Sequence, residues 1–272
     1  MLQTIANIYY RLPQQWQNLI VRTWYEGMSD LDRDMDMIFM NYGWAAPTGS
    51  RQEIHLKPED EPNRYCIQLY HRVAAAVDLQ GRDVLEVGSG RGGGASYVAR
   101  YLGPKSMTGL ELASKAVTFC RQYYKTPGLK FVQGSAEELD FPPESFDAVV
   151  NVESSHCYNR IDRFFSGVYR VLRPGGYLLY ADHRELKEAE CWRQQMLAPG
   201  FRLVEEEQIN DGVVRALELD NDRKLALIDR KVPPLLRSFF HEFAGMQGSH
   251  SQYATLRSGQ KRYLRFVLQK PL

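Results

Sequence analysis

The sequence predicts an α/β fold: a doubly wound, mainly parallel sheet of seven strands with helices on both faces. From Asn63 onward, stretches whose apolar residues recur at helical spacing alternate with short runs rich in β-branched residues. This alternation is typical of βαβ units, which build parallel sheets. The length of 272 residues and the hydrophobic fraction of 44% fit one large domain with a smaller addition.

The predicted strands are short runs of apolar and β-branched residues. They cover residues 84–87, 107–110, 129–133, 146–151, 177–181, 201–209 and 263–269. Periodic apolar residues predict helices over 63–78, 94–102, 114–124, 162–172, 188–197 and, without a break, 211–231. The motif Arg173-Pro174-Gly175-Gly176 predicts a helix stop and a turn before the fifth strand, because Pro cannot continue a helix and Gly accepts positive φ.

The first part of the chain, residues 1–62, is expected to form a helical N-terminal cap or lid and a linker, ahead of a core over 63–272. Helix-like stretches lie at about 5–25 and 30–40. The polar segment 51–62 is typical of a mobile connection between the two parts.

Charge and hydropathy restrict the partners of the protein. With 34 basic and 33 acidic side chains the formal net charge is +1, and no basic stripe stands out, so we expect no nucleic-acid partner. No apolar run approaches the roughly 20 residues that cross a membrane. The N-terminus lacks the apolar region of a secretory signal, so we expect a soluble, cytoplasmic protein without stable membrane insertion. The oligomeric state stays open.

The cysteines and histidines show no metal-ligand spacing. No two of the four cysteines form a CxxC pair, and the six histidines contain no HExxH motif. We therefore expect reduced thiols and no bound metal.

A glycine-rich turn gives the strongest local signal. The motif Glu86-Val87-Gly88-Ser89-Gly90-Arg91-Gly92 follows the first predicted strand, where glycines let a ligand approach the main chain. Because the Glu86 carboxylate would repel a phosphate, the turn suits a ligand with a cationic amine. Glu111 ends the next strand and is either a partner for two ribose hydroxyls or a solvated strand-end acid.

These motifs resemble the class I S-adenosylmethionine-dependent methyltransferases. The supporting segments follow in the same order as in that family: Gly109-Leu110-Glu111-Leu112, Gly134-Ser135-Ala136-Glu137, Phe146-Asp147-Ala148-Val149-Val150 and Leu172-Arg173-Pro174-Gly175-Gly176. The resemblance implies a Rossmann-like fold and S-adenosylmethionine as cofactor, with S-adenosylhomocysteine as product. It implies a cofactor-binding set of Glu86, Gly88, Ser89, Gly90, Gly92, Glu111, Leu112, Ser135, Ala136 and Asn151.

In that set the glycines flank the methionine part, Glu111 holds the ribose and Ser135 and Ala136 border the adenine. Asn151 lies beneath the cofactor at the end of the fourth strand. Ser135 stands where many relatives carry Asp, and its hydroxyl can still bond the adenine amino group.

Two further segments, 151–156 and 180–184, resemble methyltransferases that modify small molecules and lipids, in particular those acting on phthiotriolone-type lipids and glycopeptidolipid sugars. Tyr42-Gly43-Trp44 resembles an element of sterol C-methyltransferases. The aromatic residues in the segments before and after the core indicate a sizeable, partly apolar acceptor. Tyr42, Trp44 and Phe239, the last within an aromatic lid segment near 232–250, are expected to bind it, with core packing as the alternative.

Methyl transfer to a hydroxyl benefits from a general base. His156 is the first candidate, because it follows the fourth strand at the edge where doubly wound sheets bind ligands, with a loop-ordering role as the alternative. Glu153 is a candidate for orienting His156 or the acceptor, and His183 is the alternative base. Transfer to carbon and a step without methyl transfer, such as a cyclisation, remain alternative functions. A nicotinamide reductase fits Glu86 badly.

Overall fold

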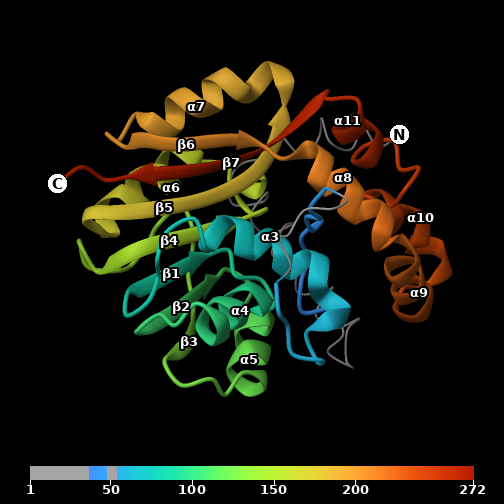
Figure 1. The fold of residues 1–272 in the computed structure, drawn as a ribbon, viewed down its shortest axis with the longest axis horizontal. Helices are drawn as coiled ribbons and strands as arrows, with labels where there is room; N and C mark the ends of the chain where they lie inside the picture. Colours follow the sequence, from blue (N-terminus) through green and yellow to red (C-terminus); the bar gives the residue numbers. More distant parts are fainter. Residues whose placement is uncertain (1–36, 48–53) are drawn as a thin grey trace.

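One mixed β-sheet forms the centre of the structure, a computed structural model that describes residues 37–47 and 54–272 (Figure 1). Within these residues the sheet has seven strands in the order β3-β2-β1-β4-β5-β7-β6. The strands are β1 (Asp83–Val87), β2 (Ser106–Glu111), β3 (Leu129–Gln133), β4 (Phe146–Val152), β5 (Leu172–Glu185), β6 (Arg202–Gln208) and β7 (Lys261–Gln269).

The first five strands pair in parallel, and β7 lies antiparallel between β5 and β6. The order reverses at β1, which pairs with β2 on one side and β4 on the other. Open sheets of this kind bind ligands beyond the carboxyl ends of the strands at such a switch point. The predicted fold class, a mainly parallel seven-stranded sheet, is confirmed.

Helices cover both faces of the sheet (Figure 1). The described helices are α3 (Arg64–Ala74), α4 (Gly93–Tyr101), α5 (Ser114–Tyr123), α6 (Ile161–Val171), α7 (Ala189–Leu197), α8 (Asn210–Leu219), α9 (Asn221–Lys231), α10 (Pro234–Phe243) and α11 (Tyr253–Arg257). Short 3-10 turns occur at η1 (Glu61–Asn63), η2 (Ser155–Cys157) and η3 (Leu186–Glu188).

Two large apolar cores lie on the two faces of the sheet. Residues of α3, α4, α5, α8 and α11 contribute to one core, and residues of α6 and α7 contribute to the other. Val84 and Leu85 are neighbours in β1 but belong to different cores, since successive side chains of a strand point to opposite faces. The same alternation turns Glu86 toward α3.

The single helix predicted over 211–231 is wrong. It is two helices, because α8 ends at Leu219 and α9 begins at Asn221. The residue between them, Asp220, binds Nε and Nη2 of Arg223 through its carboxylate at 2.6 Å each. Asp is a poor residue for a helix interior. The apolar spacing continues across the break, so periodicity alone does not reveal it.

The turn predicted at 173–176 is incorporated in β5. Helix α6 stops at Val171, as the Pro-Gly-Gly motif predicts, but the strand begins at once with Leu172. Leu172 pairs with Phe146 and Tyr177 with Ala148, so the residues between them bulge opposite Asp147.

Residues 37–44 form a strap rather than the end of the helix predicted over 30–40. Residues 37–40 are not helical. The carbonyl oxygen of Ile38 accepts the N–H of Gly93 at 3.2 Å, and the N–H of Trp44 donates to the carbonyl of Tyr65 at 3.0 Å. The rest of the predicted cap, residues 1–36, lies outside the described residues.

The described part of the expected linker is anchored to the core. The carboxylate of Asp60 accepts two hydrogen bonds from Arg100 at 2.7 Å and one from the hydroxyl of Tyr101 at 2.5 Å. Among the described helices, none has the length and apolar content needed to cross a membrane.

Candidate active site

A cavity lies over the carboxyl ends of β1, β2 and β4, at the switch point of the sheet. Its wall comes from the strap, α3, the glycine-rich turn, the loops after β2, β3 and β4, and the end of α10. The lining residues are Ile38, Phe39, Met40, Asn41, Tyr42, Tyr70, Gly88, Ser89, Gly90, Arg91, Gly94, Leu110, Glu111, Leu112, Ala113, Gly134, Ser135, Ala136, Glu137, Val152, Glu153, Ser154, His156, Cys157, Tyr158 and Phe243.

In the turn between β1 and α4, main-chain atoms of glycine residues border the cavity directly. Gly88 and Gly90 both line it and have φ angles of 74° and 52°, which residues with a Cβ rarely adopt. A Cβ on Gly88 would lie 1.8 Å from Oγ of Ser154. The space in front of this turn therefore requires glycine.

Glu86 lies directly behind the cavity wall. Its side chain is fully buried, and Oε1 accepts a hydrogen bond from the hydroxyl of Tyr70, a wall residue, at 2.6 Å. The other oxygen, Oε2, has no partner among the described residues. Burial raises the pKa of Glu86 to about 8. A buried carboxylate with an unused oxygen is suited to a cationic group, which would restore its charged form.

Glu111 lines the cavity at the end of β2. Its Oε2 accepts the N–H of Gly90 and its Oε1 the N–H of Ala113, both at 2.9 Å. Burial raises its pKa above the ordinary range. Because each carboxylate oxygen accepts more than one hydrogen bond, the fixed group can still bind a pair of hydroxyls.

Of the remaining residues in the predicted cofactor-binding set, some line the cavity and others lie behind its wall. Ser89, Leu112, Ser135 and Ala136 line the cavity. Asn151 is buried behind it, where its Nδ2 donates to the Val87 carbonyl at 2.8 Å and to the hydroxyl of Tyr158, a wall residue, at 3.0 Å.

Gly92 also lies outside the wall. A Cβ on this residue would lie 2.6 Å from the ring of Tyr124 and 2.7 Å from that of Phe131. Its place in the motif is therefore explained by the packing at the start of α4.

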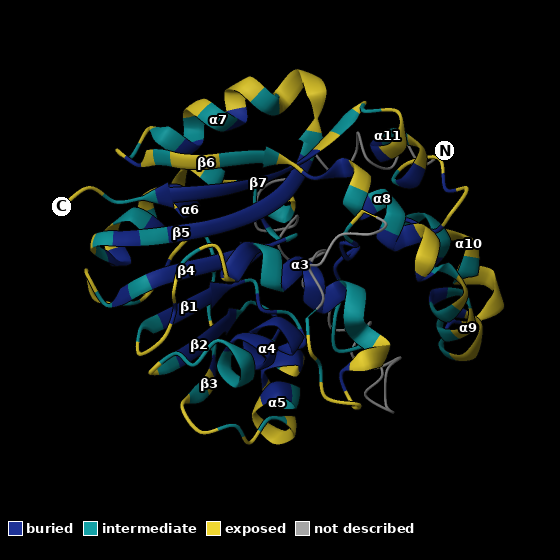
Figure 2. Ribbon diagram, viewed as in Figure 1, coloured by how far each residue is buried: buried dark blue, intermediate teal, exposed yellow. Residues whose placement is uncertain are grey.

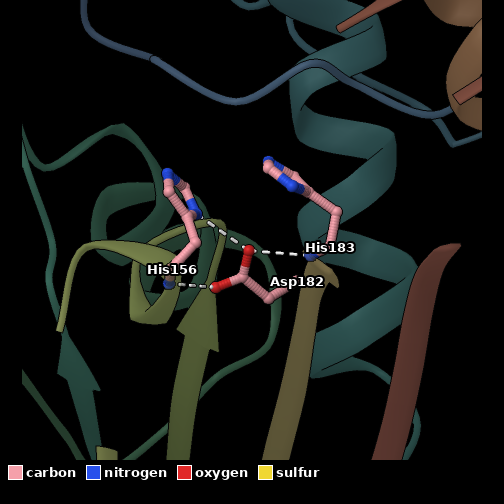
Figure 3. A group of neighbouring side chains, drawn as sticks. All are labelled: His156, Asp182 and His183. Carbon is pink, nitrogen blue, oxygen red and sulfur yellow. Dashed lines mark hydrogen bonds and ion pairs between the residues drawn. The ribbon is translucent and has the colours of Figure 1, made fainter. Parts of the chain in front are cut away.

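His156 and Asp182 form a hydrogen-bonded pair at the cavity (Figure 3). His156 follows β4, Asp182 lies near the end of β5, and His156 Nδ1 is 2.9 Å from Oδ1 of Asp182. The Asp182 side chain is completely buried, whereas 31% of the His156 side chain is exposed. Nδ1 is held by the carboxylate, and the side chain of Cys157 is a second hydrogen-bond partner of the ring. This is the arrangement of an oriented general base.

The charge of Asp182 also affects the titration of His156. Burial alone would lower the pKa of His156, but the Cys157 sulfur and the Asp182 carboxylate outweigh it and hold that pKa well above the ordinary value. Burial alone would raise the pKa of Asp182, but the positive charges of His156 and Arg184 hold that pKa well below the ordinary value. The pair thus consists of a basic imidazole and a permanent carboxylate.

His183, the alternative base of the sequence prediction, does not line the cavity. Its ring is stacked between those of His156, at 4.7 Å, and Tyr42, at 5.6 Å. Burial lowers its pKa well below the ordinary value, and Nε2 has no hydrogen-bond partner among the described residues. The geometry therefore favours His156 over His183 as the base.

His156, Asp182 and His183 also offer three ligand atoms within 4.8 Å of one another. Oδ1 of Asp182 is already bound by His156 Nδ1 and the His183 N–H, and Oδ2 by the Ser155 hydroxyl and the His156 N–H. Arg184 adds a positive charge at 3.5 Å. These contacts favour a proton-accepting pair over a metal centre.

Glu153 lies beside the pair on the same loop and lines the cavity. Its carboxylate accepts the N–H of Tyr42 at 2.8 and 3.1 Å, which fastens the strap to the site. Burial raises its pKa to about 7. Its φ of 47° is rare for a residue with a Cβ.

Of the residues predicted to bind an acceptor, Tyr42 lines the cavity, whereas Trp44 and Phe239 do not. Trp44 is buried in the core against α8, and the Arg72 guanidinium lies 4.4 Å from its ring centre. Phe239 is on the outer side of α10, with an exposed fraction of 42%.

Sequence reasoning missed several residues of the site. Asp182 is part of the segment 180–184, yet nothing in the pattern distinguishes it from other strand-end acids. Tyr70 and Tyr158 occupy ordinary positions of helix and loop. The apolar contribution of Ile38, Phe39 and Met40 depends on the path of the strap across the sheet edge, which periodicity does not predict.

The fold and the site define the class of this protein. A family model described as a methyltransferase domain matches residues 85–180, which include the glycine-rich turn and β4. Curated methyltransferases about 40% identical to the chain cover more than nine tenths of it. The chain belongs to the S-adenosylmethionine-dependent methyltransferases of Rossmann-like fold and is an enzyme of that family.

Two of these relatives illustrate the sequence similarity. A fatty-acid O-methyltransferase of Mycolicibacterium smegmatis is 41% identical over 263 residues, covering 96% of this chain and 92% of the relative. A phthiotriol/phenolphthiotriol dimycocerosates methyltransferase of Mycobacterium tuberculosis is 43% identical over 250 residues, covering 92% and 91%.

Solved structures share the fold at lower identity. The cyclopropane synthase MmaA2 from Mycobacterium tuberculosis has a TM-score of 0.66 at 18% identity, covering 89% of this chain and 95% of that one. The cyclase SpnF has a TM-score of 0.69 at 20% identity, covering 93% and 96%. At these identities the likeness concerns the fold alone.

Proposed function

We propose that the protein transfers the methyl group of S-adenosylmethionine to a hydroxyl group of a sizeable, partly apolar acceptor of the lipid or polyketide type, with His156 as general base. The observation that carries the proposal is the His156–Asp182 pair, whose imidazole lies in the wall of the same cavity as Gly88, Gly90 and Glu111. The two curated relatives, named for a fatty acid and for phthiotriol lipids, support the lipid character of the acceptor.

The residues of the cavity fit the proposed cofactor. Glu86 supplies a buried carboxylate with an unused oxygen for the amine of the methionine part, and Glu111 supplies a fixed carboxylate for the ribose hydroxyls. Gly88 and Gly90 keep side chains out of the space between them. When bound, the cofactor supplies an activated methyl group on a sulfonium.

The base is needed because an aliphatic hydroxyl is a weak nucleophile until its proton is removed. In the proposed mechanism Nε2 of His156 accepts this proton while Asp182 holds Nδ1–H and stabilises the imidazolium that forms. In this mechanism Glu153 orients the loop and the strap, because its carboxylate accepts the N–H of Tyr42.

The apolar character of the acceptor is supported by the wall near the strap. Ile38, Phe39, Met40 and Tyr42 of the strap and Phe243 of α10 present apolar surface to the cavity. The proposal includes the division of the chain into a cap over 1–62 and a core over 63–272. This division is supported by the strap, which forms part of the cavity wall. The proposal also includes a lid segment over 232–250, which is supported by Phe243, since this residue lines the cavity.

The test combines calorimetry with a transfer assay. Titration of the full chain with S-adenosylmethionine should show one binding site. Incubation with the cofactor carrying a labelled methyl group and a panel of long-chain alcohols, hydroxylated polyketides, glycolipids and fatty acids should label a hydroxyl-bearing acceptor. His156→Ala should bind the cofactor normally and lose transfer.

The alternative functions give different products. A new C-methyl group would assign transfer to carbon, and an unconsumed cofactor during turnover would assign a step without methyl transfer. A carboxylic acid is already ionised at neutral pH, so methylation of a fatty acid would persist in His156→Ala. Any of these three outcomes contradicts the proposal.

A further inference from the structure

A chain of buried hydrogen bonds leads to Asp182, the partner of His156, from the side away from the imidazole. The Nε1–H of Trp192 donates to the Tyr180 hydroxyl at 3.0 Å, and that hydroxyl is hydrogen-bonded to the hydroxyl of Ser155. Oγ of Ser155 lies 2.6 Å from Oδ2 of Asp182. These side chains are all buried, and Figure 2 shows that β5, which carries Tyr180 and Asp182, is buried over most of its length.

The chemistry of the groups fixes the direction of this chain. A carboxylate only accepts, an indole nitrogen and a guanidinium only donate, and a hydroxyl has a single proton to donate. The Ser155 proton is therefore directed to Asp182, and the Tyr180 hydroxyl donates to Ser155. Nη2 of Arg184 donates to the same Ser155 oxygen at 3.0 Å. Every member of the chain thus offers a proton toward the carboxylate, which favours its ionised form.

Arg184 also places a full positive charge beside this carboxylate. Its Nη1 lies 3.5 Å from Oδ2 of Asp182 and donates to the carbonyl of His183 at 2.7 Å. The guanidinium carbon lies 4.8 Å from the ring centre of Trp192, and only 13% of the side chain is exposed. A guanidinium keeps its proton throughout the physiological pH range, so this charge is permanent.

The charge of Arg184 has its greatest effect when His156 is neutral, which is the state that accepts a proton. A protonated His156 compensates the charge of Asp182 by itself. Once the imidazole is neutral, Arg184 is the described basic side chain that remains within ion-pair distance of Asp182. A fully buried carboxylate without a cation is costly, so without Arg184 the pair would retain its proton.

We propose that Arg184 is a positioning residue of the candidate active site, which balances the charge of Asp182 while His156 is neutral and thereby lets the imidazole act as a base. Arg184 acts through Asp182 and Ser155, since it does not itself line the cavity. Its role in methyl transfer rests on the proposed function, whereas its effect on the protonation of His156 does not.

The other ionisable groups around the pair are the same in every variant of Arg184. The acidic and basic ones are Glu153 on the loop after β4, Cys157 in η2, His183 on β5, Glu188 in η3 and Lys261 on β7. The tyrosines are Tyr42, Tyr158 and Tyr263, and burial raises the pKa of each well above the ordinary value. A difference between the wild type and such a variant therefore reports the guanidinium.

The first measurement is an NMR titration of the full chain labelled with ¹⁵N-histidine, without cofactor or acceptor. His156→Gln identifies the signals of His156. Arg184→Met removes the charge and keeps much of the volume, so the His156 imidazole should retain its proton to higher pH than in the wild type. Arg184→Lys restores a charge and should move the titration back toward that of the wild type. Arg184→Gln, which keeps a donor for Ser155, gives the same test if Arg184→Met folds poorly.

The second measurement is the pH dependence of kcat with a long-chain secondary alcohol. In Arg184→Met the rise of activity should move to higher pH, whereas Asp182→Asn should move it to lower pH. Near neutral pH, kcat of Arg184→Met should fall about tenfold or more, because each pKa unit by which the proton is held longer lowers the neutral imidazole tenfold. Much of this loss should return at high pH, which a purely structural defect does not allow.

Arg193→Met is the matched control. Arg193 also pairs with a carboxylate, that of Glu206, but this pair joins α7 to β6 and does not line the cavity. The control should leave both the titration of His156 and the pH dependence of kcat unchanged.

An unchanged or lower titration of His156 in Arg184→Met and Arg184→Gln would overturn the proposal. A loss of activity in Arg184→Met that is equal at every pH would also overturn it, since this indicates a structural role alone. If the titration shifts upward but the wild type methylates no acceptor, the proposed function is rejected and the role of Arg184 stands. If the wild type methylates a hydroxyl and the titration does not shift, the role of Arg184 is wrong and the proposed function stands.

Discussion

Asp182 holds His156 by two atoms at once: its Oδ1 lies 2.9 Å from the ring Nδ1, and its Oδ2 accepts the backbone N–H of the same residue at 2.9 Å. The carboxylate therefore fixes both the position of the residue and the orientation of its ring. Because Asp182 is fully buried, its charge acts on the imidazole with little screening by water.

Replacing Asp182 by Asn should lower kcat strongly and leave cofactor binding intact. The amide keeps the shape but neither stabilises the imidazolium nor enforces the tautomer with a proton on Nδ1, so we expect a loss of about 10²–10⁴-fold. Steady-state kinetics and calorimetry with the cofactor measure the two effects. His55→Ala, at an exposed histidine, is the control and should change neither. A kcat within threefold of the wild type in Asp182→Asn would refute the role of the pair.

The pH dependence of kcat should reflect the raised pKa of His156. Its imidazole must be neutral to accept a proton, and Asp182 and Cys157 keep it protonated to higher pH than an ordinary histidine. Activity should therefore rise with pH and level off only above the ordinary histidine range. Asp182→Asn removes one source of the shift, so the rise should move to lower pH while the plateau falls. A kcat independent of pH across this range would contradict the assignment.

Cofactor affinity should also depend on pH, through Glu86. With a pKa of about 8 the carboxyl is mostly protonated at neutral pH, and a bound cationic amine favours its ionised form. Binding should therefore release a proton and strengthen as the pH rises toward about 8. Glu86→Gln should weaken binding about ten- to hundredfold and remove this slope. Calorimetry in buffers of different ionisation enthalpy counts the proton, and Glu190→Gln on α7 is the control.

His183→Phe should retain most of the activity. The phenyl ring preserves the stack between Tyr42 and His156, and the lost Nε2 has no hydrogen-bond partner among the described residues. We expect kcat to stay within about threefold and thermal stability to be unchanged or higher, since a buried polar atom without a partner costs free energy. A loss of activity as large as that of His156→Ala would identify His183 as the base instead.

Gly88→Ala should abolish tight cofactor binding. The substitution combines a φ of 74° with a Cβ only 1.8 Å from Oγ of Ser154, so the loop that carries His156 must move. Gly248→Ala is the matched control, because Gly248 has a φ of 89° but no atom within 4 Å of the added Cβ. The control should lose only about 1–2 kcal/mol of unfolding free energy. Equal cofactor affinity in both variants would show that the turn does not border the cofactor.

The sequence predicted the parts of the fold that local chemistry determines. Apolar runs gave the strands, and the glycine motif marked the turn at the switch point of the sheet. The break at Asp220 was not predictable, because the apolar stripe passes through it. The continuous strand from Leu172 was not predictable either, since a Pro-Gly-Gly motif forms a turn in isolation and a bulge when a neighbouring strand pairs with both of its ends.

For the site, the sequence predicted residues at the carboxyl ends of strands but not which of them meet. His156 was found from its position after a strand, whereas its partner Asp182 is 26 positions away and depends on the pairing of β4 with β5. The sequence predicts that Trp44 binds the acceptor together with Tyr42, because the two residues belong to one aromatic motif. The backbone of the strap turns between them, so that one side chain faces the cavity and the other packs against α8.

The most direct test of the central claim is product analysis with the methyl-¹³C cofactor, a long-chain secondary alcohol and either the wild type or His156→Ala. We expect a ¹³C-methoxy signal on the alcohol with the wild type and its loss in the variant, while the variant still binds the cofactor. A labelled C-methyl group, label that remains on the cofactor during turnover, or undiminished methoxy formation by His156→Ala would contradict it.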